Sequence, residues 1–127
     1  YSISELIDSC LAKNINKVNR ILNENKFSAD ECILILRTLL FKTKRLLAIS
    51  KKNIINKNVD ETISSFKPPI FWKDKQVVKN QIMNWKIKDI ENLMIEVQNT
   101  EINVKKHTTN SLYLVLDFIL ATTSSSN

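Results

Sequence analysis

The sequence contains no glycine, and both of its prolines stand side by side, at Pro68 and Pro69. Tight β-hairpin turns commonly need a residue at positive φ, and glycine adopts that conformation most easily. A multi-stranded antiparallel domain without glycine would be unusual, because asparagine would have to serve at its turns. The same absence excludes a glycine-rich phosphate-binding loop. The composition therefore favours a helical protein.

Residues that carry chemistry are also scarce. There are two cysteines, Cys10 and Cys32, and a single histidine, His107. Both cysteines lie among helix-patterned residues without a CxxC partner, which is typical of buried free thiols in a reducing compartment. His107 follows two lysines at an expected helix end, where the helix dipole favours positive charge. No zinc or calcium spacing occurs. We therefore expect no catalytic residue, metal or cofactor in this chain.

Long hydrophobic runs are missing as well. The most apolar segment, 112–121, is shorter than the roughly 18 residues of a membrane span and contains Asp117. No secretory signal is recognisable. These absences predict a cytoplasmic protein with no membrane partner. Because Tyr1 falls inside a helix-start pattern, we expect the chain to be a piece of a longer protein. The end, 122–127, is typical of a disordered tail.

What the sequence does contain is helical periodicity along nearly its whole length. A chain of 127 residues suits one domain, and 43% hydrophobic residues supply its core. Ser2 with Glu5, and Ser28 with Glu31, match the capping box that begins a helix. We predict an all-α domain over residues 1–121, a single bundle of five to seven helices, whose clearest segments are 2–11, 16–25, 28–51, 59–66, 89–106 and 109–121.

The stretch FKPPIFWKDK, residues 66–75, interrupts this periodicity. Proline lacks a backbone N–H, and the residue before a proline avoids the helical region. Pro68 and Pro69 therefore predict a rigid, extended elbow between two helical halves, with Pro69 at or just before the next helix start. We expect Phe71 and Trp72 to plug this elbow, and Trp72 to be largely buried. We expect the stretch 66–75 to be structural first, and to contact a partner protein at its edge second.

The long helix expected over 28–51 carries two apolar faces. Leu36 and Leu39 lie on one face, whereas Leu34 and Phe41 lie on another, beside Arg45. Such a helix is either enclosed by its own domain or shared with a neighbouring protein. Arginine and aromatic residues are enriched in interface cores. We therefore predict that Leu34, Phe41 and Arg45 contribute to a protein interface.

One carboxylate falls inside the inward stripe of the helix expected over 89–106. Glu101 occupies that position, where an unpaired charge would cost several kcal/mol. We predict a buried polar pair in which Glu101 accepts a charge-assisted hydrogen bond from Arg37 or Arg45, with Lys105 as a weaker i+4 partner. The alternative is that the end of this stripe is exposed to solvent, so that Glu101 needs no buried partner.

The formal charge of +6 suits a polyanionic partner, although net charge alone says little about the fold or the partner. Cations gather near the end of segment 28–51, where the helix dipole favours them by about 0.3–1 kcal/mol each. The group comprises Lys42, Lys44, Arg45, Lys51, Lys52 and Lys57. Contacts to phosphate are the alternative explanation. A helical nucleic-acid-binding domain is therefore an alternative function, and a small helical enzyme is a more distant one.

Several motifs follow one another in a characteristic order: SISELIDSCLAKNINKVNRIL, SADECILILRTLLFKTKRLLAI, FKPPIFWKDK, IENLMIEVQNTEINVKKHTTN and a final apolar helix. Together they resemble the C-terminal domain of the delta subunit of bacterial DNA polymerase III. The similarity spans nearly the whole chain. Its more specific parts are LRTLLFKTKRLL, KPPIFWKDK and TEINVKK. None of these is a catalytic signature.

The resemblance implies a role in DNA replication. The delta subunit belongs to the clamp loader, which opens the sliding clamp and places it on primed DNA. Its C-terminal domain joins equivalent domains of the tau/gamma-type and delta-prime-type subunits in a collar, and meets DNA only through the complex. The clamp-gripping and ATPase-like parts lie in N-terminal domains. The resemblance thus implies that this chain itself catalyses no reaction. It also implies that the parent subunit belongs to a complex that synthesises DNA. It also suggests that Asn14, Asn25 and Asn110 replace glycine at turns.

Overall fold

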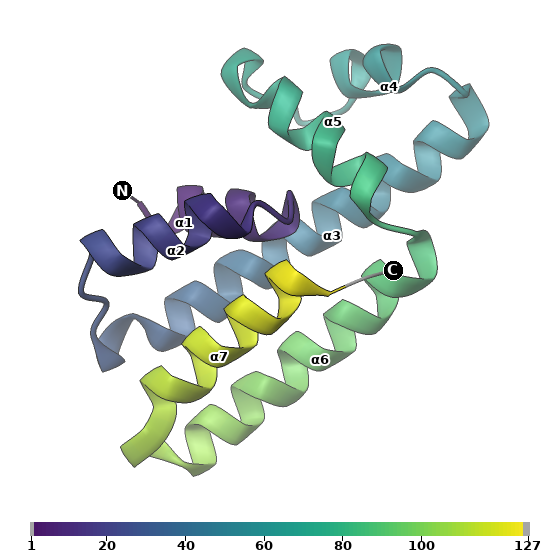
Figure 1. Cartoon of the computed structure of the whole chain (residues 1–127). Helices are drawn as coiled ribbons and strands as arrows, with labels where there is room; N and C mark the ends of the chain where they lie inside the picture. The colour runs from purple at the N-terminus through teal and green to yellow at the C-terminus, as the bar shows by residue number, and fades with distance from the viewer. Residues whose placement is uncertain (1, 126–127) are drawn as a thin grey trace.

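The computed structural model describes residues 2–125, which form seven α-helices and contain no strand (Figure 1). The helices are α1 (Ile3–Leu11), α2 (Ile15–Glu24), α3 (Cys32–Asn56), α4 (Val59–Ser65), α5 (Lys75–Asn84), α6 (Ile87–Lys106) and α7 (Ser111–Ser124). Single 3-10 turns lead into α3, α5 and α7, at Ala29–Glu31, Trp72–Asp74 and Thr108–Asn110. The predicted all-α bundle is confirmed. None of the described helices combines the length and the apolar character needed to cross a bilayer.

The larger of two cores lies between α1, α2, the first part of α3, α6 and α7. Each of these helices turns an apolar stripe inward, as its spacing predicts. Fully buried members include Leu6, Ile21, Leu36, Ile90 and Ile119, one from each helix. Figure 1 shows α3, α6 and α7 running side by side beneath the α1–α2 pair. We call α1, α2, residues 32–48, α6 and α7 the main bundle.

The remaining helices form a smaller unit that stands at the top of Figure 1. It consists of the end of α3, α4 and α5, and we call residues 49–84 the lobe. A second core holds it together through Ile49, Ile63, Phe66, Ile70 and Val78. The chain enters the lobe along α3 without a break in the helix and leaves it at the short α5–α6 junction. The Pro-Pro segment therefore joins α4 to α5 inside the lobe, not two halves of the domain.

The aromatic plug predicted at the elbow is wrong. Pro68 and Pro69 do lie in non-helical chain, and the Lys67–Pro68 peptide bond is cis. However, Phe71 and Trp72 are 57% and 69% exposed, and their ring centroids lie 5.9 Å apart. The next helix begins only at Lys75, after the 3-10 turn. Phe71 and Trp72 therefore precede the helix and do not lie on its buried face. The joint is filled by two apolar residues that flank the prolines, Phe66 and Ile70.

Side chains from the α5 end of the lobe tie it to the main bundle. Carbonyls in the last turn of a helix can accept hydrogen bonds from other parts of the chain. At the end of α1, Gln81 Nε2 donates to the carbonyl of Asp8 at 3.0 Å. Trp85 Nε1 donates to the carbonyl of Leu11 at 2.7 Å. Both donors are buried, so these bonds fix α5 and the α5–α6 junction against α1.

Lysine, rather than asparagine, takes the left-handed positions in this glycine-free chain. Lys13 and Lys57 follow α1 and α3 with φ of 57° and 55°. Left-handed residues commonly end helices in this way. Asn14, Asn25 and Asn110 all have negative φ, so the expectation that they replace glycine is wrong. Asn14 instead caps α2, accepting a hydrogen bond from a backbone N–H of its first turn.

Two predicted boundaries also change. Helix α3 continues to Asn56 instead of ending near Lys51. Helix α7 continues to Ser124, so the tail predicted over 122–127 is wrong for residues 122–124; Thr122 and Thr123 are buried. Residues 126 and 127 lie outside the described part.

Cys10 and Cys32 are buried free thiols, as predicted. Cys10 Sγ lies 3.6 Å from the carbonyl of Ile119, and burial raises the pKa of this thiol to about 12. Cys10 is therefore a core residue and not a nucleophile, because the reactive form of cysteine is the thiolate.

Candidate protein-binding surface

The outward side of α3 carries an exposed apolar ridge. Leu34, Phe41, Ala48 and Ile55 recur every seven residues, and all four are exposed. Seven residues make nearly two helical turns, so these side chains stand on one side of the helix. The exposed fractions of Leu34 and Phe41 are 56% and 66%. The second apolar face predicted for this helix is therefore not enclosed by the domain. We call these four residues the α3 ridge.

Cations border the α3 ridge on both sides. Over its 25 residues, α3 carries six Lys and Arg and no Asp or Glu. At 100° per residue, the ridge is flanked on one side by Arg37, Lys44 and Lys51, and on the other by Arg45 and Lys52. Lys42 lies away from the ridge and pairs with Asp8 of α1 at 2.7 Å. Within residues 2–125, Lys44, Arg45 and Lys51 form no ion pair.

Helix α6, which packs along α3, also carries two exposed apolar residues. Ile95 and Ile102, seven residues apart, are 57% and 51% exposed. α3 and α6 pack side by side and share one core, and each turns an exposed apolar stripe away from that core. Sequence reasoning missed these two isoleucines. Their seven-residue spacing, which matches that of the α3 ridge, was the available signal.

Glu101 lies between α3 and α6 at the edge of this surface. Its Oε1 is 3.6 Å from Arg37 Nε, and its Oε2 is 3.0 Å from Lys105 Nζ. The side chain of Glu101 is 23% exposed and that of Arg37 is 63% exposed, so the pair lies at the surface and not in the interior. Lys105 is the closer cation, and Arg45 is not a partner. The hydrogen bond from Lys105, with help from Arg37, lowers the pKa of Glu101.

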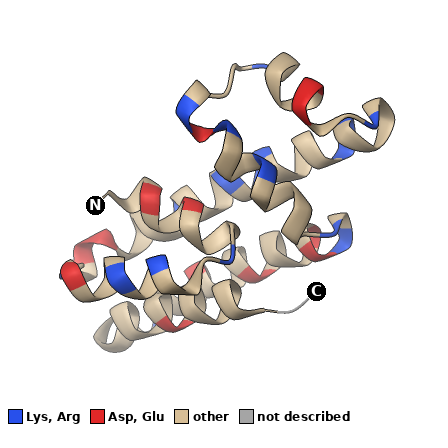
Figure 2. Cartoon of the chain, turned by 45° about the horizontal axis from the view of Figure 1, so that its top comes forward, with Lys and Arg blue, Asp and Glu red and all other residues tan. Residues whose placement is uncertain are grey.

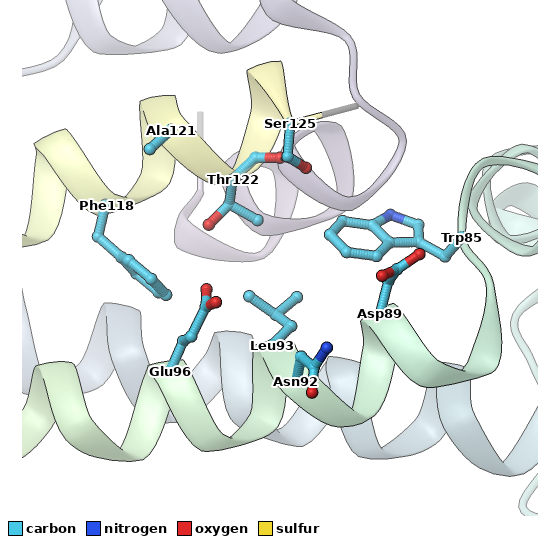
Figure 3. Close-up of a pocket in the computed structure, with 9 residues that line it drawn as sticks. All are labelled: Trp85, Asp89, Asn92, Leu93, Glu96, Phe118, Ala121, Thr122 and Ser125. Atoms are coloured by element: carbon cyan, nitrogen blue, oxygen red, sulfur yellow. The ribbon is translucent and has the colours of Figure 1, made fainter. Parts of the chain in front are cut away.

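A cavity of about 250 Å³ opens between α6 and α7 (Figure 3). Trp85 and Phe118 contribute aromatic rings to its lining, and Asp89 and Glu96 contribute carboxylates. Lys13 Nζ lies 4.3 Å from the centre of the Trp85 ring, and burial lowers the pKa of Lys13. The lining contains no histidine or cysteine that would act as a base or nucleophile. Within residues 2–125, no group of three His, Cys, Asp or Glu is placed to hold a metal.

The lobe is the most basic part of the molecule (Figure 2). Residues 49–84 include three acidic residues and seven lysines, which are Lys51, Lys52, Lys57, Lys67, Lys73, Lys75 and Lys79. The exposed pair Phe71 and Trp72 stands among them, with Lys73 Nζ 5.4 Å from the Trp72 ring centre. An exposed aromatic pair among lysines is a feature that protein interfaces and nucleic-acid sites share.

No family model, curated protein or solved structure matches this chain. The outer surface of α3 and α6 is therefore interpreted from its own residues, and the resemblance to the delta subunit depends on the motifs in the sequence.

Proposed function

We propose that this chain is the subunit-assembly, or collar, domain of a clamp loader delta subunit, which takes part in loading the sliding clamp onto primed DNA during bacterial replication. Its partners would be the tau/gamma-type and delta-prime-type subunits, and it would meet DNA through the complex. The chain itself would have no catalytic activity. The motif resemblance suggests the family, and Phe41, the residue that the motif LRTLLFKTKRLL contributes to the second apolar face of α3, is exposed.

The α3 ridge is the observation that carries this proposal. Large apolar residues exposed in a row on a rigid helix are typical of a protein interface. Phe41 and Arg45 belong to residue types enriched in interface cores. Because Leu36 and Leu39 on the opposite side of α3 already fill the core, the ridge is not needed to complete the fold. A role in assembly accounts for both faces of the helix.

The test is co-elution with purified loader subunits. The chain alone should be a monomer by size exclusion with light scattering, and should shift into a larger complex with the tau/gamma-type and delta-prime-type proteins. Phe41→Asp combined with Arg45→Glu should abolish the shift while leaving the circular dichroism spectrum unchanged. Tyr113→Asp, which puts the same aspartate at an exposed position on α7, is the control for Phe41→Asp and should co-elute like the parent.

Two results would count against the proposal. The first is a parent chain that co-elutes with neither type of subunit. The second is a tight homodimer, because a collar domain should need its heterologous neighbours. If the double variant unfolds, the ridge belongs to the core and the interface prediction fails.

Nucleic-acid binding is the second candidate, because the basic lobe and the end of α3 favour it. Binding to phosphates releases counterions, so DNA affinity would fall steeply with salt concentration. Replacing Lys44 and Arg45 by glutamate should then weaken binding and flatten this salt dependence. A parent chain that does not bind a single-stranded or duplex oligonucleotide at low salt would exclude this candidate.

A further inference from the structure

The spacing of the α3 ridge matches the geometry of a helix-binding surface. Leu34 and Ile55 are 21 positions apart, or about 31 Å along the helix. A straight helix turns by about 20° per seven-residue step, so the ridge winds slowly around α3. A second helix that crosses at about 20° follows such a winding line. A partner helix of similar length would therefore contact every residue of the ridge.

The charges around the ridge specify the chemistry of that partner. Lys44 and Lys51 lie along one side and Arg45 along the other, all without an ion pair within residues 2–125. No acid on α3 offsets them. A partner with Asp or Glu beside its apolar residues would neutralise them, whereas a basic partner would be repelled.

The same charges argue against a second copy of this chain. In a symmetric dimer built on α3, the two ridges would face each other. Each would bring its own Lys44, Arg45 and Lys51 towards the same cations of the other copy. No acid on α3 would compensate, and each copy carries a net charge of +6. The occupant is therefore a different protein.

We propose that the α3 ridge binds an amphipathic helix of another protein, with apolar residues that pack on Leu34, Phe41, Ala48 and Ile55 and acidic residues on both flanks. This inference deepens the proposed function and rests on it for the source of the helix, which would be another loader subunit. The chemistry of the helix follows from the ridge alone.

Helix α6 forms a second wall beside this site. Ile95 and Ile102 are exposed on the outward side of α6, the helix that packs along α3. Glu101 is the acid nearest to Arg37, and it would repel an acidic helix if its charge were free. Its contacts with Arg37 and Lys105, at 3.6 and 3.0 Å, neutralise it in place. The surface thus presents apolar residues and net positive charge to the partner.

The probe is a pair of synthetic helical peptides of about 21 residues, long enough to cover the ridge. Both carry leucine at the same seven-residue spacing, but one has glutamate and the other lysine at the flanking positions. Binding of the full chain is measured by fluorescence anisotropy. The glutamate peptide should bind at least about tenfold more tightly than the lysine peptide, a difference of about 1.4 kcal/mol. Equal affinity, or no binding of either peptide, would overturn the proposal.

Variants then assign the binding to the ridge. Phe41→Asp should lower the affinity for the glutamate peptide at least about tenfold, which is the loss typical of an important interface residue. Lys44→Glu with Arg45→Glu should reverse the preference, so that the lysine peptide binds better. Arg20→Glu with Lys26→Glu makes the same change in net charge on other segments, and should keep the parent's preference. If this control also reverses it, net charge and not the ridge decides binding, and the proposal fails.

A single-stranded oligonucleotide and anionic lipid vesicles serve as competitors. The proposal expects neither to displace the glutamate peptide at physiological salt. If a competitor displaces the peptide in a way that depends on Lys44 and Arg45 but not on Phe41, the surface is a general polyanion site. That result would overturn the proposal. The peptide assay contains no loader subunit, so its failure leaves the co-elution test of the proposed function intact. Reversed peptide preference without co-elution would support the helix-binding chemistry and reject the loader as its source.

Discussion

The two tryptophans lie in opposite environments, one packed into the core of the main bundle and the other exposed on the lobe. Trp85, where the lobe returns to the main bundle, is 8% exposed and donates its indole N–H to the carbonyl of Leu11. Trp72, in the lobe, is 69% exposed and contacts Phe71 and Lys73 instead of the core. A buried tryptophan needs both an apolar site and an acceptor for its N–H. Trp85 has both, and the Pro-Pro segment offers Trp72 neither.

The two regions also differ in how they are held. The main bundle joins five helical segments around one continuous core, whereas the lobe depends on a short cluster around Ile63 and Phe66. Regions with few buried apolar contacts open at lower free energy than the rest of a protein. We therefore expect the lobe to open before the main bundle, although α3 runs through both.

The largest expected effect is the difference in unfolding free energy between variants of the two tryptophans. Trp85→Ala removes a packed ring and leaves the Leu11 carbonyl without its partner, so it should cost about 3–5 kcal/mol in the free energy of unfolding. Trp72→Ala removes an exposed ring and should stay within about 0.5 kcal/mol. Urea denaturation of each variant measures both values. Similar costs would show that the aromatic pair of the lobe is packed after all.

A smaller effect should come from the core of the lobe. Ile63→Ala should cost about 2 kcal/mol, the lower end for such a change, because the lobe can collapse around the space. Hydrogen exchange should become faster in α4 and α5, with little change in α1, α6 and α7. Ser64→Ala, at the exposed neighbouring position, is the control. Equal loss of protection across both regions would mean that they unfold as one unit.

The contrast between regions also marks the limit of prediction from the sequence. In the main bundle, helix starts and buried faces follow from local rules, and Ser28 and Glu31 form the predicted capping box. In the lobe, the periodicity stops at Pro68, so nothing local decides whether Phe66 and Ile70 or Phe71 and Trp72 turn inward. That choice depends on tertiary packing against Ile49 of α3 and Val78 of α5, which the pattern around the prolines does not determine.

The candidate surface shows a similar limit. The sequence showed that Leu34 and Phe41 form a second apolar face on α3, because helical spacing alone determines which residues share a face. Whether another helix of the domain covers that face depends on where α6 packs, and spacing does not determine this. The seven-residue spacing of Ile95 and Ile102 was visible in the sequence, but their exposure depends on how α6 packs in the folded chain.

The smallest effect concerns the ion pairs that bridge helices in each region. Glu101 links α6 to Arg37 of α3 in the main bundle, and Asp60 of α4 contacts Lys79 of α5 in the lobe at 3.1 Å. Exposed pairs contribute about 0.2–1 kcal/mol. Glu101 has two cations and is only 23% exposed, whereas Asp60 has one and is 74% exposed. Glu101→Gln should therefore lower the free energy of unfolding by an amount within this range at neutral pH. Asp60→Asn should change it by an amount near zero.

The pH dependence of Glu101→Gln tests the cause of that difference. Lys105 and Arg37 lower the pKa of Glu101 in the folded chain, so the folded protein holds the ionised form more strongly than the unfolded chain does. The stabilisation is therefore fully present above the pKa of an ordinary glutamate, about 4.3, and is lost as the pH falls through the lower folded-state value. The difference in stability between the parent and Glu101→Gln should be constant near neutral pH and should shrink below about pH 4. Denaturation at a series of pH values measures it. A difference that persists at low pH would mean that glutamine disturbs packing between α3 and α6, and that the charge of Glu101 is not what links them.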